Sequence, residues 1–235
     1  MNLEKYKATI GIERLKSFGY GIENITEELL IKMYELNIKT SQALYPALSI
    51  VEVQLRNAID TMLQTVFSKT WLEDELKAQK LLLDYDYNKL QKAYETLKKR
   101  YGENNITHGK LIAELTIGFW VSLCSKKYNS KIWTKKGAFR GVFIDYPKDK
   151  REKIHEISEK LTRIKNFRNR VFHHEPILYK KEKFGIIYNI ICEIIAYLPK
   201  DNSGIFKRTN NFPNEIAKIL QEVNKAKTLS TLQSR

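Results

Sequence analysis

Apolar residues recur at steps of three and four along most of this chain, and that spacing is the strongest constraint on its fold. The clearest run has its apolar positions at Leu44, Leu48, Val51, Leu55, Ile59, Met62 and Val66. Such spacing places apolar side chains on one face of an α-helix. The 235 residues also include only 10 Gly and 5 Pro, which leaves few of the turns that an all-β fold needs. We therefore expect an all-α helical bundle.

The same periodicity, with its start and stop signals, predicts where the helices lie. We expect them at about residues 26–36, 41–67, 73–100, 110–125, 149–174 and 184–198, with short helical pieces at 126–147 and a weak amphipathic stretch at 214–223. Asn24 or Thr26 can cap the first helix, and Asp149 with Glu152 has the capping-box spacing. Gly118, in a segment that is apolar on nearly every side, either marks close approach of another backbone or is simply tolerated.

The predicted domain organisation is one helical domain at residues 25–200. An extension at 1–24 adds an N-terminal helix, and a partly flexible helical extension follows at 201–235. The start of the chain has no signal-peptide pattern, and the longest apolar stretch, at 184–198, is interrupted by Tyr188, Asn189 and Glu193. We therefore expect a cytoplasmic protein that does not enter the membrane. Two cysteines are too few for a disulfide framework or a cysteine-rich zinc site.

The chain is strongly basic, since 41 Lys and Arg against 27 Asp and Glu give a net charge of 41 − 27 = +14. Such a charge attracts polyanions, although lysine also serves solubility alone. The charge alone therefore leaves two alternatives open: the protein binds nucleic acid, or its lysines only keep it soluble. Separate basic clusters that could contact phosphates lie at residues 98–100, 126–127, 135–136 and 180–183.

One arginine in the expected helix at 149–174 breaks its apolar pattern. The step of 3, 4 and 3 residues that begins at Ile154 predicts the next inward position at residue 168, which is Arg168. An inward guanidinium is costly unless a partner compensates it. The alternatives are that Arg168 extends to the rim or pairs with a structural carboxylate.

Two histidines end the same helix. His173 lies four residues after Asn169 and therefore on the same face, and His174 follows directly. Adjacent side chains point apart and no acidic cluster has ligand spacing, so we expect no metal and no cofactor. The alternative to a catalytic role is two cationic residues that the helix dipole favours at a C-terminus.

The expected helix at 41–67 offers a partner for these groups. Glu52 lies close to its apolar face, and Arg56 is the i+4 neighbour of Glu52. Either the two form a surface ion pair, or Glu52 faces inward and orients Arg168 or a histidine.

These residues carry a resemblance to a known family. The string RNRVFHHEP at residues 168–176 resembles the Arg-x4-6-His signature of HEPN-domain ribonucleases, and in its fuller form that of the Abi-like abortive-infection family of the AbiD and AbiF kind. The segments VEVQLRN at 51–57 and LTIGFW at 115–120 resemble the first long helix and the central helix of that family. The resemblance spans roughly residues 25 to 200.

The resemblance implies a metal-independent endoribonuclease that acts as a toxin or abortive-infection effector in phage defence. It implies Arg168 and His173 as the catalytic pair and Asn169 as the polar residue after the arginine, with His174 in a supporting position. The implied partners are RNA, a second copy of the chain in a homodimer, and a neutralising RNA or protein antitoxin. The alternative is a non-catalytic HEPN-like module that binds RNA or protein.

Overall fold

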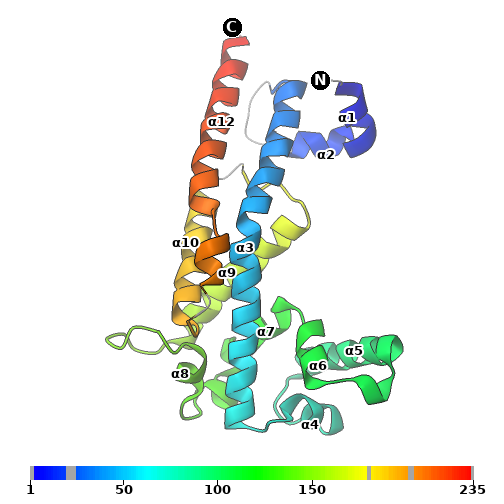
Figure 1. The fold of residues 1–235 in the computed structure, drawn as a ribbon, viewed down its shortest axis with the longest axis vertical. Coiled ribbons are helices and arrows are strands. Elements are labelled where there is room, and N and C mark those ends of the chain that lie inside the picture. The colour runs from blue at the N-terminus through cyan, green and yellow to red at the C-terminus, as the bar shows by residue number, and fades with distance from the viewer. Residues whose placement is uncertain (1–2, 20–24, 179–180, 201–203, 234–235) are drawn as a thin grey trace. The chain divides into compact units, whose positions relative to one another are not determined.

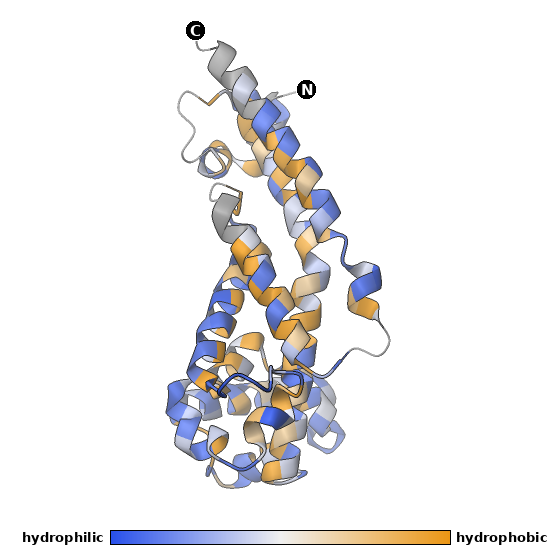
Figure 2. Ribbon diagram, turned by 90° about the vertical axis from the view of Figure 1, so that its left-hand side faces the viewer, coloured by the Kyte–Doolittle hydropathy of each residue, from blue (hydrophilic) through white to orange (hydrophobic). Residues whose placement is uncertain are grey.

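The structure is a computed structural model that describes residues 3–19, 25–178, 181–200 and 204–233. Over these ranges the regular structure is helical and contains no strand (Figure 1), which confirms the all-α prediction. Colouring by hydropathy shows hydrophobic and hydrophilic residues side by side along the long helices, as amphipathic helices require (Figure 2). Within the described ranges, every helix is too short or too polar to cross a membrane.

The chain forms two compact units. The first comprises Met1–Ser49, Asn166–Asn189 and Asp201–Arg235, and the second comprises Ile50–Lys165 and Ile190–Lys200. Three helices contribute to both units, namely α3 (Glu27–Val66), α9 (Ile154–Phe172) and α10 (Lys181–Tyr197).

The first unit packs its N-terminal and C-terminal helices on the first part of α3. Its other helices are α1 (Leu3–Ile10), α2 (Ile12–Ser17), α11 (Ile205–Thr209) and α12 (Phe212–Gln233). The hydroxyl of Tyr6 in α1 donates to Glu35 Oε1 at 2.8 Å. Lys32 Nζ in α3 lies 2.5 Å from Glu222 Oε2 in α12. These contacts hold α1 and α12 on α3 (Figure 1).

The second unit holds most of the aromatic core. Its other elements are α4 (Trp71–Lys77), α5 (Asp84–Tyr101), η1 (Glu103–Asn105), α6 (His108–Glu114), α7 (Ile117–Leu123), η2 (Lys126–Tyr128), η3 (Asn129–Trp133) and α8 (Ala138–Val142). The rings of Phe119 and Trp120 pack edge to face with centroids 5.1 Å apart, and Trp71 lies 6.3 Å from Trp120. Short helical pieces therefore fill residues 126–147, as the sequence predicts.

Helix α3 is one helix of 40 residues, so the expected break between residues 36 and 41 is wrong. The polar residues at that point fit inside the helix because their hydroxyls bond back to carbonyls one turn earlier. Thr40 Oγ1 donates to Leu36 O at 2.8 Å, and Ser41 Oγ donates to Asn37 O at 2.9 Å. The helix begins as predicted, since Thr26 Oγ1 accepts from the Leu29 N–H at 3.2 Å. Asn24 lies outside the described residues.

The expected helix at 73–100 is broken into α4 and α5, which corrects the prediction. The buried carboxylate of Glu75 holds the loop between them. Its Oε1 accepts from the N–H groups of Lys80 and Leu81 at 3.0 and 2.7 Å, and its Oε2 accepts from the Leu82 N–H at 2.9 Å. Three backbone donors that a helix would have used are thus satisfied by one side chain.

The expected helix at 110–125 is also broken, into α6 and α7. The N-cap of α7 is Thr116, whose extended backbone (φ −74°, ψ 162°) ends the helical path. A Cβ at Gly118 would meet only Thr116 Oγ1 at 3.6 Å and the Lys165 side chain at 4.0 Å, which are ordinary contacts. Gly118 is therefore tolerated rather than required by a close backbone.

Helix α9 begins at Ile154, so the capping box predicted at Asp149 is wrong. Glu152 instead lies 2.6 Å from Arg140 Nε and is engaged in an ion pair. At the C-terminal end of the chain, α12 is longer than the expected stretch at 214–223.

Candidate functional site

The buried ridge of α9 runs through Phe167 rather than Arg168. Ile164, Phe167 and Val171 are buried, whereas Arg168 is half-buried. With 3.6 residues per turn, the residues three and four positions after Ile164 both lie near its helix face, and the apolar Phe167 takes the buried position there. Phe167 therefore takes the buried position that the spacing predicts at residue 168, and Arg168 lies half-buried beside it. The guanidinium carbon of Arg168 lies 4.1 Å from the centroid of the Phe172 ring, in a cation–π contact.

The C-terminal end of α9 is a left-handed turn made by a histidine. His174 has φ 57°, the one positive φ of a non-glycine residue in the described chain. Its N–H donates to Val171 O at 3.1 Å, and the Glu175 N–H donates to Arg170 O at 2.9 Å. This bonding is the Schellman pattern, in which the left-handed position is usually glycine. A histidine there costs backbone strain, which makes the position a candidate for function.

Two distant residues fix the chain just beyond this turn. Arg14 Nη2 donates to His174 O at 2.9 Å. The buried amide of Asn37 donates to Glu175 O at 3.2 Å and accepts from the Ile177 N–H at 2.8 Å. Side chains of α2 and α3 therefore set the position of both histidines.

Part of the RNRVFHHEP string is structural. Arg170 Nε lies 3.0 Å from Glu175 Oε2, and the same guanidinium donates to the carbonyl of Pro176. Val171 is buried in the core of the first unit. The residues of the string that are left for chemistry are Arg168, Asn169, Phe172 and the two histidines.

A pocket of about 820 Å³ opens beside the helix end, entirely within the first unit. Its lining consists of Arg14, Tyr34, Asn37, Ile38, Ser41, Gln42, Tyr45, Val171, Phe172, His173 and His174. None of these lining residues is acidic. Both histidines line it, next to the left-handed turn at His174.

The other predicted site residues lie around or away from the pocket. Asn169 is half-buried; its carbonyl accepts from the His173 N–H at 2.8 Å, and it is not among the lining residues. Glu52 and Arg56 belong to the second unit and are half-buried. Arg56 Nε donates to Asn57 Oδ1 at 3.3 Å. The orientation of Arg168 or a histidine by Glu52 stays a prediction.

The basic clusters also stay predictions as phosphate contacts. Lys98 Nζ lies 2.8 Å from Glu103 Oε2, and Arg100 Nη1 lies 3.4 Å from Glu114 Oε2, so part of their charge is compensated in the second unit. The lysines at 126–127 and 135–136 are exposed. Lys180 lies outside the described residues, as do the side chains at 181 and 183.

No pattern in the sequence indicates Arg14 or Asn37 as site residues. They lie 160 and 138 positions from the residues whose backbone they hold. No local spacing connects positions so far apart, so only the fold reveals them.

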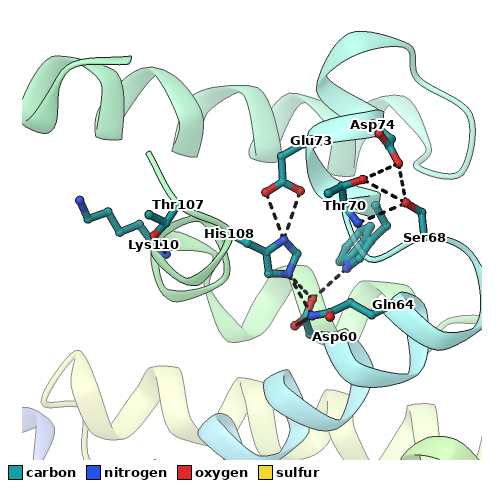
Figure 3. Close-up of polar contacts among 10 residues, drawn as sticks. Asp60, Gln64, Ser68, Thr70, Glu73, Asp74, Thr107, His108 and Lys110 are labelled. Carbon is teal, nitrogen blue, oxygen red and sulfur yellow. Dashed lines mark hydrogen bonds and ion pairs between the residues drawn. The ribbon is translucent and has the colours of Figure 1, made fainter. Parts of the chain in front are cut away.

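A second histidine cluster lies in the second unit, around His108 (Figure 3). His108 Nε2 lies 2.8 Å from Asp60 Oδ1, and its Nδ1 lies 3.2 Å from Glu73 Oε2. The buried Asp60 also accepts from Trp71 Nε1 at 2.8 Å and from Gln64 Nε2 at 2.7 Å. Because both ring nitrogens face carboxylates, this imidazole has none left for a ligand, and it ties α6 to α3 and α4.

The described residues contain no group of three His, Cys, Asp or Glu side chains that could hold a metal ion. Burial by itself lowers the pKa of His108, but the hydrogen bonds and charges of Asp60 and Glu73 outweigh it and raise the pKa above its ordinary value. The folded state therefore favours the protonated ring, which can donate to both carboxylates.

We expect this cluster to make stability depend on pH. A raised folded-state pKa means that the stabilisation is fully present below the unfolded value of about 6.5 and is lost as the pH rises through the folded value. The melting temperature should therefore fall over this window in the wild type and change less in His108→Gln. The exposed His155 provides the control variant, His155→Gln, which should follow the wild type. Parallel curves for the wild type and His108→Gln would contradict the assignment.

Comparisons of the chain with models of protein families, with curated proteins and with solved structures found no match. The interpretation of function therefore depends on the pocket and on the resemblance of residues 168–176.

Proposed function

We propose that the protein is a metal-independent endoribonuclease of the HEPN kind, acting as a toxin or abortive-infection effector. The observation that carries the proposal is the pair of imidazoles, His173 and His174, that line one pocket together with Arg14. Neither imidazole has a hydrogen bond or ion pair with another residue in the part of the chain that the structure describes, in contrast to His108. Two such imidazoles and a guanidinium can supply the proton transfers and the charge stabilisation for RNA cleavage without metal.

The proposed reaction is a transesterification at a phosphodiester. One imidazole takes the proton of the ribose 2′-OH, and the 2′-oxygen then attacks the adjacent phosphorus. The bond from phosphorus to the 5′-oxygen breaks, and the leaving oxygen takes a proton from an imidazolium. The products are a 2′,3′-cyclic phosphate and a 5′-hydroxyl. An imidazole near neutral pH can serve in either proton transfer.

An arginine supplies the fixed charge that the reaction needs. Negative charge grows on the phosphorane oxygens, and a guanidinium fork stabilises it. We assign this role to Arg168, which stacks on the pocket residue Phe172, with Arg14 in the pocket wall as a second cation. Asn169, one turn before His173, is proposed as the polar catalytic residue that follows the arginine.

A non-catalytic module that binds RNA is the second candidate. It is favoured by the observation that Arg168 and Asn169 are not among the residues that line the pocket. On the basis of the resemblance we also propose a homodimer and a neutralising RNA or protein.

Product analysis tests the function directly. We expect the purified chain to cut end-labelled RNA in the presence of excess chelator and to leave 2′,3′-cyclic phosphate and 5′-hydroxyl ends. Phosphatase and kinase treatment of the fragments identifies both ends. Intact RNA retained by the protein would support the binding module, and cleavage that needs added Mg²⁺ would contradict the proposed chemistry.

A further inference from the structure

The pocket beside α9 has an exposed aromatic wall. Tyr45 on α3 is 56% exposed and Phe172 on α9 is 38% exposed. Their ring centroids are 6.1 Å apart with planes tilted by 37°, and both residues line the pocket. Ile38, also in the lining, is 42% exposed. Large apolar side chains left open to solvent beside one pocket indicate a ligand surface rather than core.

Two arginines lie beside this aromatic wall. The guanidinium carbon of Arg168 lies 4.1 Å from the centroid of the Phe172 ring, and Arg14 belongs to the pocket lining. None of the lining residues carries a carboxylate to oppose them. Flat apolar faces next to cations match a nucleotide, which joins a planar base to an anionic phosphate. A volume of about 820 Å³ suits a ligand of that size.

We propose that Tyr45 and Phe172 form a stacking subsite for a nucleobase next to the phosphate that is cut, so that the substrate is single-stranded RNA. The position of the subsite next to the cut phosphate rests on the proposed function, whereas the stacking of a base on Tyr45 and Phe172 does not. Bases in a duplex are paired and stacked on one another, and side chains cannot enter the deep major groove of A-form RNA. Only an unpaired base can stack on the exposed ring of Tyr45.

The proposal is tested by binding to a variant in which cleavage is expected to be slow. In the His173→Ala background, fluorescence anisotropy compares a labelled single-stranded RNA, the same RNA with abasic positions, and a duplex of the same length. We expect the single strand to bind more tightly than either of the others. We expect Tyr45→Ala to weaken binding of the single strand by roughly 5- to 100-fold, the value of one stacked base, and Tyr45→Phe to retain it.

The matched control is Tyr85→Ala, which removes a tyrosine that is 70% exposed and stacks with Lys89 at 4.0 Å in the second unit. It should leave binding unchanged. Circular dichroism should show that Tyr45→Ala remains folded, since the ring that it removes is largely exposed.

Equal binding of the abasic RNA or the duplex would overturn the subsite, as would unchanged binding by Tyr45→Ala. Base-dependent binding by a wild-type chain that leaves RNA intact would uphold the subsite and reject the ribonuclease. If the wild type cleaves RNA but binds abasic RNA as tightly as RNA with bases, the ribonuclease would be upheld and the subsite rejected.

Discussion

His173→Ala should lower the rate of RNA cleavage by about 100-fold or more, because the pocket loses one of its two proposed proton-transfer groups. Arg168→Ala should have an effect of similar size, since it removes a charge that opposes the growing charge on the phosphorane. Both effects should appear mainly in the rate constant for cleavage at saturating protein, measured in single turnover under chelator, because the proposed roles of both groups are in the transition state.

Matched controls lie on the same helix. His155 and Arg163 are exposed residues of α9 in the second unit, and His155→Ala and Arg163→Ala should cut RNA at the wild-type rate. Wild-type rates in both His173→Ala and Arg168→Ala would remove the basis of the proposed mechanism. Loss of activity in the control variants would show that the helix, rather than the site, is sensitive to substitution.

Glu75→Ala should destabilise the second unit by about 3 kcal/mol, since three backbone N–H groups lose a charged acceptor inside the protein. Glu75→Gln should cost less. Its amide oxygen can still accept from Lys80 and Leu81, whereas its NH₂ group would face the N–H of Leu82.

Tryptophan fluorescence during urea unfolding provides the measurement. All three tryptophans belong to the second unit, at Trp71, Trp120 and Trp133, so the signal reports the part that Glu75 supports. Glu159→Ala, at an exposed position of α9, is the control and should change stability little. A free energy of unfolding within about 0.5 kcal/mol of wild type for Glu75→Ala would refute the role of this carboxylate.

Periodicity predicted most helices because burial of an apolar face is a local pattern. Periodicity failed where the hydrogen bonds of individual side chains determine whether the backbone stays helical. Glu75 ends a helical stretch by binding a loop, and nothing in the residues between Trp71 and Tyr101 shows that the carboxylate turns inward. Thr40 and Ser41 look like a helix boundary, yet they continue the helix by bonding to carbonyls one turn earlier.

The candidate site was predictable only in its contiguous part. Residues 168–176 form a readable string, which pointed to the helix end and its histidines. Helical spacing allows either residue 167 or residue 168 at the buried position. Packing in the core decides that Phe167 is buried there, and the spacing alone could not show this. Arg14 and Asn37 reach the site through the tertiary fold, so no reading of local sequence could have found them.

The left-handed backbone at His174 has a kinetic consequence. It brings two neighbouring imidazoles of the same molecule to one pocket, so the proton acceptor and the proton donor of the proposed reaction need not come from separate molecules. Under the proposed function, the rate of turnover should then be first order in protein at every dilution, and self-association would supply no proton-transfer group that one polypeptide lacks.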